Sequence, residues 1–173
     1  MNPNHDTHTN AYAVIRLTGY KEAGFGVSFQ DGFLGELIAL KRLHLNDNKL
    51  KEIPEDISNC EELIEIYIGG NEITLLPSGI GRLPVLKKLY CGRNHLRNIP
   101  PSIGRLESLQ ELFLSGNEIG VVPRDVGRLK SLKRLSLSFN QVKEIPNEVM
   151  DLADTGQLEL NIDNNPLEML LDI

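Results

Sequence analysis

The stretch from Leu86 to Leu96 reads LKKLYCGRNHL, and its spacing of leucines and asparagine returns four more times in the chain. The pattern is L-x-x-L-x-L-x-x-N-x-L, in which Cys91 replaces one aliphatic residue. It opens at Leu40, Leu63, Leu86, Leu109 and Leu132, and neighbouring starts lie 23 residues apart. A unit this short cannot bury its apolar face alone, so stacked units share one continuous core. The sequence therefore predicts an elongated solenoid of repeats.

A second constant string follows each asparagine. An aliphatic residue and a proline come first, at Ile53-Pro54, Leu76-Pro77, Ile99-Pro100, Val122-Pro123 and Ile145-Pro146. Three units continue with Ile80-Gly81-x-Leu83, Ile103-Gly104-x-Leu106 and Val126-Gly127-x-Leu129. The chain from about Leu34 to Leu167 thus resembles the intracellular form of the leucine-rich repeat family. That 23-residue type occurs in cytosolic Ras-pathway and polarity scaffolds, plant Ras-group proteins and bacterial effectors.

The repeat predicts an α/β fold. Each L-x-L segment is a short strand, and stacked units place these strands about 4.8 Å apart in a curved parallel sheet that forms the concave face. The proline fixes φ near −65° and favours an extended turn before a short helical or 3₁₀ segment on the convex face. The glycines Gly81, Gly104 and Gly127 are expected to allow a tight return to the next strand.

The asparagine column is expected to be structural. A buried side-chain amide can pair with backbone groups of the turning chain that would otherwise remain unsatisfied. The predicted asparagine ladder consists of Asn48, Asn71, Asn94, Asn117, Asn140 and Asn165.

The chain divides into three predicted parts. Residues 1–10 are expected to be disordered, residues 11–33 to form an N-terminal cap, and residues 34–173 to form the leucine-rich repeat domain. Ala11 to Phe29 is interpreted as a β-hairpin, and a degenerate repeat beginning near Leu17 is the alternative. A sixth, partial repeat begins at Gln157 after an interval of 25 residues, which predicts a bulge around residues 153–156 on the convex or edge side.

Composition narrows the classes of partner and compartment. The 173 residues fit one domain, and a net charge of −6 argues against nucleic acid, whose phosphates require a basic face. Cys60 and Cys91 fall at inward-pointing positions and predict packed thiols. The polar start does not resemble a secretory signal, and no apolar run approaches a membrane span. We expect a monomer in the cytoplasm, or in a host cytoplasm if the chain is a bacterial effector.

One column of the predicted concave face is aromatic. His44, Tyr67, Tyr90 and Phe113 occupy the same position on adjacent strands and are expected to be exposed, as interface hot spots often are. Stacking of neighbouring rings on one another is the alternative explanation. The next column alternates in charge, which indicates salt bridges between strands. It consists of Arg42, Glu65, Lys88, Glu111, Arg134 and Glu159.

Small residues predict a shallow groove beside the aromatic column. They are Asn46, Gly69, Gly92, Ser115, Ser138 and Asp163. Asp47, Arg93 and Phe139 lie in the following column and would border this groove. The predicted protein-binding residues are therefore His44, Tyr67, Tyr90, Phe113, Arg93, Phe139 and Asp47.

The sequence offers no catalytic, cofactor-binding or metal-binding motif. None of its four histidines has a metal-ligand partner at suitable spacing, and no phosphate-binding or nucleophile motif is present. Resemblance to the family implies a noncatalytic protein-interaction module. The alternative is the recognition domain of a larger enzyme or signalling protein, or a translocated bacterial effector. Replacing Tyr67, Tyr90 and Phe113 by alanine is expected to weaken partner binding at a nearly unchanged melting temperature.

Overall fold

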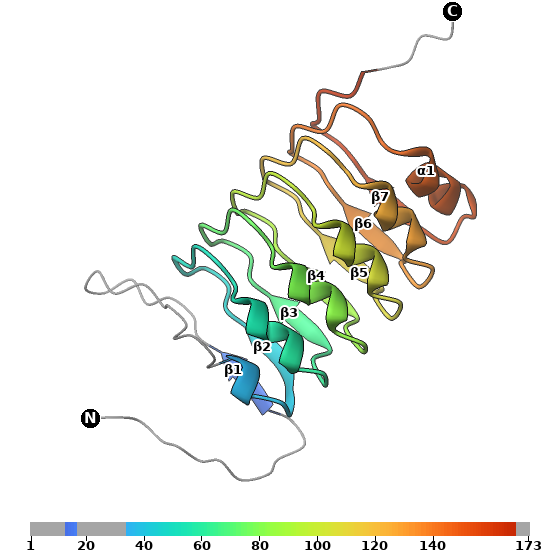
Figure 1. Cartoon of the computed structure of the whole chain (residues 1–173). Coiled ribbons are helices and arrows are strands. Elements are labelled where there is room, and N and C mark those ends of the chain that lie inside the picture. The colour runs from blue at the N-terminus through green and yellow to red at the C-terminus, as the bar shows by residue number, and fades with distance from the viewer. Residues whose placement is uncertain (1–12, 17–33, 169–173) are drawn as a thin grey trace, which may run out of the picture.

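Seven strands form one parallel sheet in the computed structural model, which describes residues 13–16 and 34–168 (Figure 1). Their order in the sheet is their order in the chain: β1 (Ala13–Arg16), β2 (Leu40–His44), β3 (Glu65–Tyr67), β4 (Lys88–Tyr90), β5 (Glu111–Phe113), β6 (Arg134–Ser136) and β7 (Glu159–Asn161). The 3₁₀ helices are η1 (Leu34–Glu36), η2 (Glu55–Asn59), η3 (Ser78–Arg82), η4 (Pro101–Arg105) and η5 (Arg124–Arg128). One α-helix, α1 (Asn147–Asp154), takes the place of a sixth.

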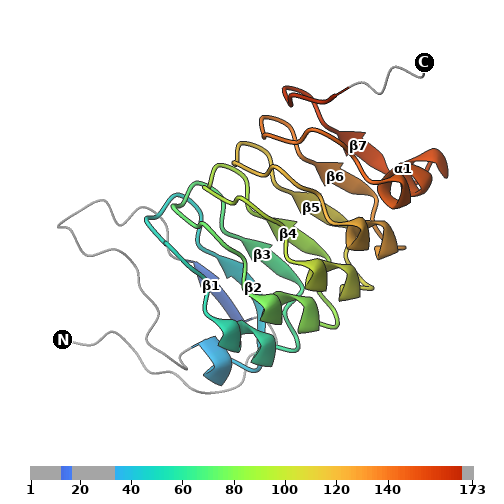
Figure 2. The same cartoon turned by 45° about the horizontal axis from the view of Figure 1, so that its top comes forward.

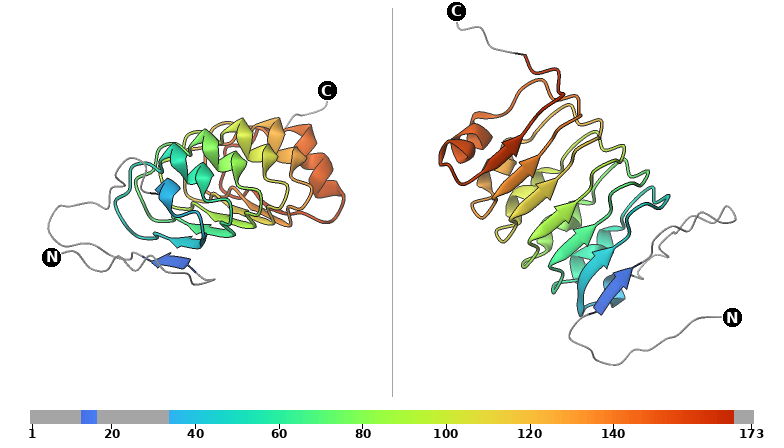
Figure 3. Two further views of the ribbon diagram at one scale, coloured as in Figure 1. Left: turned by 60° about the horizontal axis from the view of Figure 1, so that its bottom comes forward. Right: turned by 180° about the vertical axis from the view of Figure 1, so that it is seen from behind.

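The strands lie side by side along one long side of the molecule, and the helices lie along the other (Figures 2 and 3). Each repeat is one turn of the coil, and it stacks on the repeats before and after it. The predicted leucine-rich repeat solenoid is confirmed. We call the surface that carries the outward-pointing strand residues the sheet face.

Strand register follows the repeat columns. Arg42 pairs with Glu65, Leu43 with Ile66 and His44 with Tyr67 across β2 and β3, and the same three columns stay in register through β6. The middle residue of each triplet points into the core, so its neighbours on either side reach the sheet face.

The core is a continuous column of aliphatic side chains between the sheet and the helices. Leu43, Ile66, Leu89 and Leu112 on the strands and Ile57, Ile80 and Ile103 on the 3₁₀ helices are at most 1% exposed. Cys60 and Cys91 are fully buried and free, as predicted. Burial raises the pKa of Cys60 to about 11 and that of Cys91 further, so neither is a reactive thiolate.

The prolines act as predicted. Pro54, Pro77, Pro100 and Pro123 each precede a 3₁₀ helix in an extended conformation, with φ between −64° and −71°. Pro146 precedes α1 with φ −57°. A fixed φ and a missing N–H group suit a residue at this boundary.

The glycine column has a different role from the predicted one. Gly81, Gly104 and Gly127 lie inside η3, η4 and η5, not in the return to the strand, and none has positive φ. Instead they allow the helices to stack closely. A Cβ atom on Gly81 would lie 2.2 Å from the carbonyl oxygen of Ser102, and on Gly127 it would lie 2.4 Å from that of Glu148.

The two additional residues of the last interval appear on the convex side, as predicted. Here the five-residue 3₁₀ helix of the other repeats becomes the eight-residue helix α1, followed by a turn at Thr155 and Gly156. Gly156 takes φ 73°. The strand register is kept, because β7 pairs with β6 in the same columns.

At the N-terminal end, β1 extends the sheet. It runs parallel to β2, with Val14 opposite Arg42 and Arg16 opposite His44. The other half of the predicted hairpin, Phe25 to Phe29, lies outside the described residues, as do the predicted disordered residues 1–10 and the predicted repeat start near Leu17.

Candidate functional site

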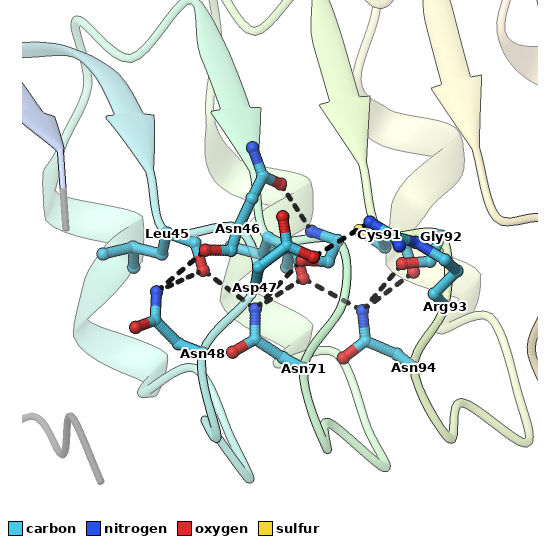
Figure 4. A network of polar contacts seen from close by, with 11 residues as sticks. Leu45, Asn46, Asp47, Asn48, Asn71, Cys91, Gly92, Arg93 and Asn94 are labelled. Carbon is cyan, nitrogen blue, oxygen red and sulfur yellow. Dashed lines mark hydrogen bonds and ion pairs between the residues drawn. The ribbon is translucent and has the colours of Figure 1, made fainter. Parts of the chain in front are cut away.

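The asparagine ladder closes each strand and holds the backbone that carries the sheet face. Asn94 donates from Nδ2 to the carbonyl oxygens of Ile68 and Cys91 at 2.9 and 3.0 Å, and its Oδ1 accepts the N–H of Ile73 at 3.0 Å. Asn71 repeats this one turn earlier, as Figure 4 shows. Asn165 keeps the geometry despite the longer last interval. The predicted structural ladder is therefore present in the structure.

The aromatic column is a stack of rings, which we call the aromatic stripe. Ring centroids of His44 and Tyr67 lie 4.5 Å apart, those of Tyr67 and Tyr90 4.7 Å, and those of Tyr90 and Phe113 4.6 Å. Interplanar angles of 35–57° are those of tilted aromatic pairs. All four side chains are half-buried, which is less exposure than predicted, because each ring covers part of its neighbour.

Hydrogen bonds and a cation fix the end of this stripe. The hydroxyl of Tyr90 donates to Oε2 of Glu111, and Arg134 reaches Oε1 of the same carboxylate at 2.5 Å. The guanidinium of Arg134 also lies 5.4 Å from the centre of the Phe113 ring. The rings thus form a rigid surface.

These contacts shift the pKa values of Tyr90 and Glu111. Burial and the hydrogen bond to Glu111 raise the pKa of Tyr90, so this phenol stays protonated where an ordinary tyrosine ionises. Burial also acts to raise the pKa of Glu111, but the hydrogen bonds from Tyr90 and Arg134 outweigh it and hold the pKa below its ordinary value. Glu111 is therefore a carboxylate at neutral pH.

The alternating charges form ion pairs across the strands, as predicted. Glu65 lies between Arg42 at 3.2 Å and Lys88 at 3.5 Å, and Glu111 pairs with Arg134. These pairs balance the charge beside the stripe and are consistent with a structural role.

The small-residue column separates the stripe from a row of left-handed residues. Asp47 and Arg93 belong to this row and form an ion pair at 3.0 Å, although they lie two repeats apart (Figure 4). Gly70 lies between them with φ 67°, and a Cβ atom there would lie 2.3 Å from Oδ1 of Asp47. The missing side chain of Gly70 leaves the space for this ion pair.

Phe139 lies in the same row under backbone strain. Its φ is 55°, a left-handed value that is uncommon for a bulky residue, whereas Gly70 and Gly116 occupy equivalent positions freely. The side chain of Phe139 does not pack in the core, since the residue is 63% exposed.

A groove that the sequence reasoning missed lies on the opposite side, between η5 and α1. It encloses about 600 Å³ and is lined by basic and acidic side chains, among them Arg124, Lys130, Glu148 and Asp151. The longer last interval was its only sequence signal, because that interval produces α1.

Residues 13–16 and 34–168 contain neither a cluster of metal ligands nor a membrane-spanning helix. There, no group of three or more histidines, cysteines or acidic residues could hold a metal ion. No helix of the described chain is both long and apolar enough to cross a membrane.

Comparison with known proteins agrees with this architecture. A family model described as "Leucine-rich repeat region" matches residues 7–117, and one described as "Leucine Rich Repeat" matches residues 108–129. No curated protein sequence matches significantly.

Three solved structures illustrate the likeness. A leucine-rich repeat protein of Leptospira interrogans is 39% identical with a TM-score of 0.73, over 79% of this chain and 34% of that one. The plant peptide hormone receptor RGFR1 in complex with RGF2 is 31% identical with a TM-score of 0.71, and the match covers 78% of this chain and 22% of the receptor chain. An internalin of Listeria monocytogenes is 25% identical with a TM-score of 0.68, and the match covers 82% of this chain and 40% of the internalin chain.

The chain thus spans about a third of the length of the Leptospira protein and less than half of each of the others. The first family model alone covers more than half of this chain, including β1. With the stacked strands, the asparagine ladder and the 23-residue period, these matches show that the chain belongs to the leucine-rich repeat family.

Proposed function

We propose that this chain is a noncatalytic protein-interaction module that binds a partner protein through its sheet face. The contact surface would comprise the aromatic stripe, the ion pair of Asp47 with Arg93, and Phe139. The single observation that carries the proposal is Phe139, an aromatic side chain that is 63% exposed on a left-handed backbone.

The free-energy cost of the left-handed backbone at Phe139 supports a binding role. A left-handed residue with a side chain costs about 1–2 kcal/mol relative to the ordinary helical region, and glycine avoids that cost. An exposed phenylalanine recovers little of it by burial in the unbound chain. Strained positions that the rest of the fold maintains are concentrated at functional sites.

The stripe supplies a complementary surface. Its half-buried rings are held by their mutual contacts and by the Tyr90–Glu111 hydrogen bond, so little side-chain freedom remains to be lost on binding. Aromatic residues and arginine are enriched in interface cores. The receptor RGFR1, solved in complex with RGF2, shows that a member of this fold can hold a peptide ligand.

Replacing Phe139 by glycine should separate binding from stability. The free energy of unfolding is expected to stay within about 1 kcal/mol of the wild type, since relief of the left-handed strain offsets the higher entropy of the unfolded chain. Partner affinity should fall by about tenfold or more, the loss typical of an aromatic hot spot. Denaturant unfolding and titration with the partner measure the two effects.

A matched control is available on another surface. Val121 is 67% exposed and apolar, but it lies in the segment before η5 and not on the sheet face. Val121→Ser should leave partner affinity unchanged. Equal loss of affinity in both variants would contradict the assignment of the sheet face.

The triple replacement of Tyr67, Tyr90 and Phe113 by alanine should also weaken partner binding. The melting temperature of this variant should fall, whereas the sequence alone predicted that it would stay nearly unchanged. The reason is that the rings contact one another, and each aromatic pair contributes about 0.5–1.5 kcal/mol beyond its burial. Circular dichroism must therefore show that the variant is folded at the temperature of the binding measurement. Full affinity in a folded triple variant would exclude the stripe from the interface.

A second candidate is that the module is the recognition part of a longer enzyme, signalling protein or bacterial effector. One observation favours it: Leu160 on β7 and Ile162 directly after this strand are half-buried, whereas their counterparts in the preceding repeat, Leu135 and Leu137, are buried. A further repeat would cover them. Sequencing the gene beyond the codon for Ile173 tests this candidate, and an immediate stop codon would contradict it.

We infer further that the module acts as a monomer in a cytoplasm, its own or that of a host. The two buried, free cysteines support this inference. Fractionation of cells that express the tagged chain, followed by sedimentation of the purified protein, tests both points.

A further inference from the structure

Charge is strongly segregated along this solenoid, although its net value is only −6. Residues 82–143 contain twelve lysines and arginines against four aspartates and glutamates. Residues 144–173 contain eight acidic residues and no lysine or arginine. The middle repeats are therefore basic and the last repeat is acidic, a contrast that the net charge of the chain hides.

Five cations of the middle repeats lie where the 3₁₀ helices lead into the strands, and a sixth, Arg124, begins η5 and lines the groove beside α1. We call this surface the basic flank, and it consists of Arg82, Lys87, Arg105, Arg124, Lys130 and Lys133. Arg82 and Arg105 end successive stacked helices, and Lys133 directly precedes β6. Arg82 and Arg105 occupy equivalent positions of adjacent repeats and so lie side by side. Lys87 and Lys133 lie on either side of Gln110 in another such column, and Glu107 interrupts the basic flank opposite Lys130.

None of these six cations forms an ion pair among the described residues, but Arg82 interacts electrostatically with Glu55, and Lys130 donates a hydrogen bond to the carbonyl oxygen of Gly127 at 3.2 Å. Every ion pair of the neighbouring columns involves other cations, such as Arg134 with Glu111 and Arg128 with Asp125 at 2.8 Å. Like charges that lie close together repel one another, so these cations add little to the stability of the isolated fold. They do create a positive potential along the flank.

The groove beside α1 is a recess within the basic flank. Arg124 and Lys130 line the groove of about 600 Å³ between η5 and α1. A second hollow of about 390 Å³ shares Lys130 and Gln157 with it and adds Lys133 and Gln110. The two hollows therefore continue one another along the basic flank.

We propose that the basic flank is a second docking surface, which binds an acidic segment of a polypeptide. Carboxylates of the segment would pair with the six cations. The side-chain amides of Gln110 and Gln157 make no hydrogen bond within the described chain and can pair with the backbone of the segment.

Acidic residues on the wall of the groove favour a peptide over nucleic acid. Glu148 and Asp151 on α1 line the same groove as Arg124 and Lys130. They would repel a continuous phosphate backbone, whereas a peptide can place an uncharged or basic residue against them. This surface is separate from the sheet face, so the proposal is independent of the function proposed above.

A charge-matched pair of variants tests the proposal. Arg124→Glu/Lys133→Glu reverses two charges of the basic flank, and Lys49→Glu/Lys51→Glu reverses two exposed lysines outside it. Both variants change the net charge equally, and none of the four side chains makes an ion pair within the described residues. The probe is fluorescein-labelled oligoglutamate, and its binding is followed by fluorescence anisotropy from low to physiological ionic strength.

We expect the wild type to bind oligoglutamate and to lose affinity as salt rises. The flank variant should lose about tenfold or more, and the control variant about twofold or less. Absence of wild-type binding, or equal loss in both variants, would overturn the proposal. Tighter binding of a single-stranded oligonucleotide of equal charge, with the same sensitivity to the flank variant, would overturn the choice of a peptide.

Discussion

Replacing Asn94 by alanine is expected to lower the free energy of unfolding by about 3 kcal/mol or more. The change removes all four hydrogen bonds of the side-chain amide, and it leaves the N–H of Ile73 and the carbonyl oxygens of Ile68 and Cys91 without their amide partner. The bonds to these three groups are buried, and an unsatisfied buried polar group costs about 1–3 kcal/mol. Urea denaturation measures the loss.

Asn98 provides the control in the same repeat. Its side chain is exposed and makes no hydrogen bond within the described residues, so Asn98→Ala should change the free energy of unfolding by less than about 0.5 kcal/mol. A loss of less than 1 kcal/mol for Asn94→Ala would show that water replaces the amide, and would contradict the role assigned to the ladder.

Replacing Gly81 by alanine is expected to be the second most disruptive single change. The new methyl group would meet the carbonyl oxygen of Ser102 at 2.2 Å and its carbonyl carbon at 2.7 Å. These are backbone atoms of the next repeat, which can move only if η3 and η4 separate. Overpacking of this kind costs about 1–3 kcal/mol, and the backbone contact places Gly81 at the upper end. Thermal unfolding followed by circular dichroism measures it.

Gly120 is the matched glycine for this experiment. A Cβ atom there meets nothing within 4 Å, and its φ is not positive. Gly120→Ala should therefore be neutral or slightly stabilising, by up to about 1 kcal/mol. If Gly81→Ala proved equally neutral, the close stacking of the 3₁₀ helices would not depend on glycine.

Periodicity explains why most of the fold could be predicted. A residue such as Leu89 or Asn94 recurs in every unit, so its environment is the same in each and can be inferred from the pattern. The strands, the ladder, the prolines before the helices and the inward cysteines were all predicted for this reason.

Features that depend on one repeat or on side-chain packing could not be predicted in this way. Gly81 was assigned to a turn because glycine alone does not reveal whether it serves φ or close approach. The stripe was expected to be exposed, since the sequence does not show how far rings such as Tyr67 and Tyr90 cover each other. The left-handed φ of Phe139 recurs at the same position of every repeat, but the spacing of leucines and asparagine does not by itself give a backbone angle.

The groove beside α1 was missed for a related reason. Its walls come from one irregular interval, and its charges belong to residues that vary between repeats, such as Arg124 and Glu148. The longer interval predicted a bulge, but not that the resulting helix would leave an open recess beside η5.

Affinity capture from a cell lysate shows whether the sheet face binds a protein. Wild type, Phe139→Gly and Val121→Ser are immobilised at equal amounts, and bound proteins are quantified by mass spectrometry. We expect a protein that is retained by the wild type and by Val121→Ser but is strongly reduced on Phe139→Gly. Equal retention of every captured protein by wild type and Phe139→Gly would contradict this expectation.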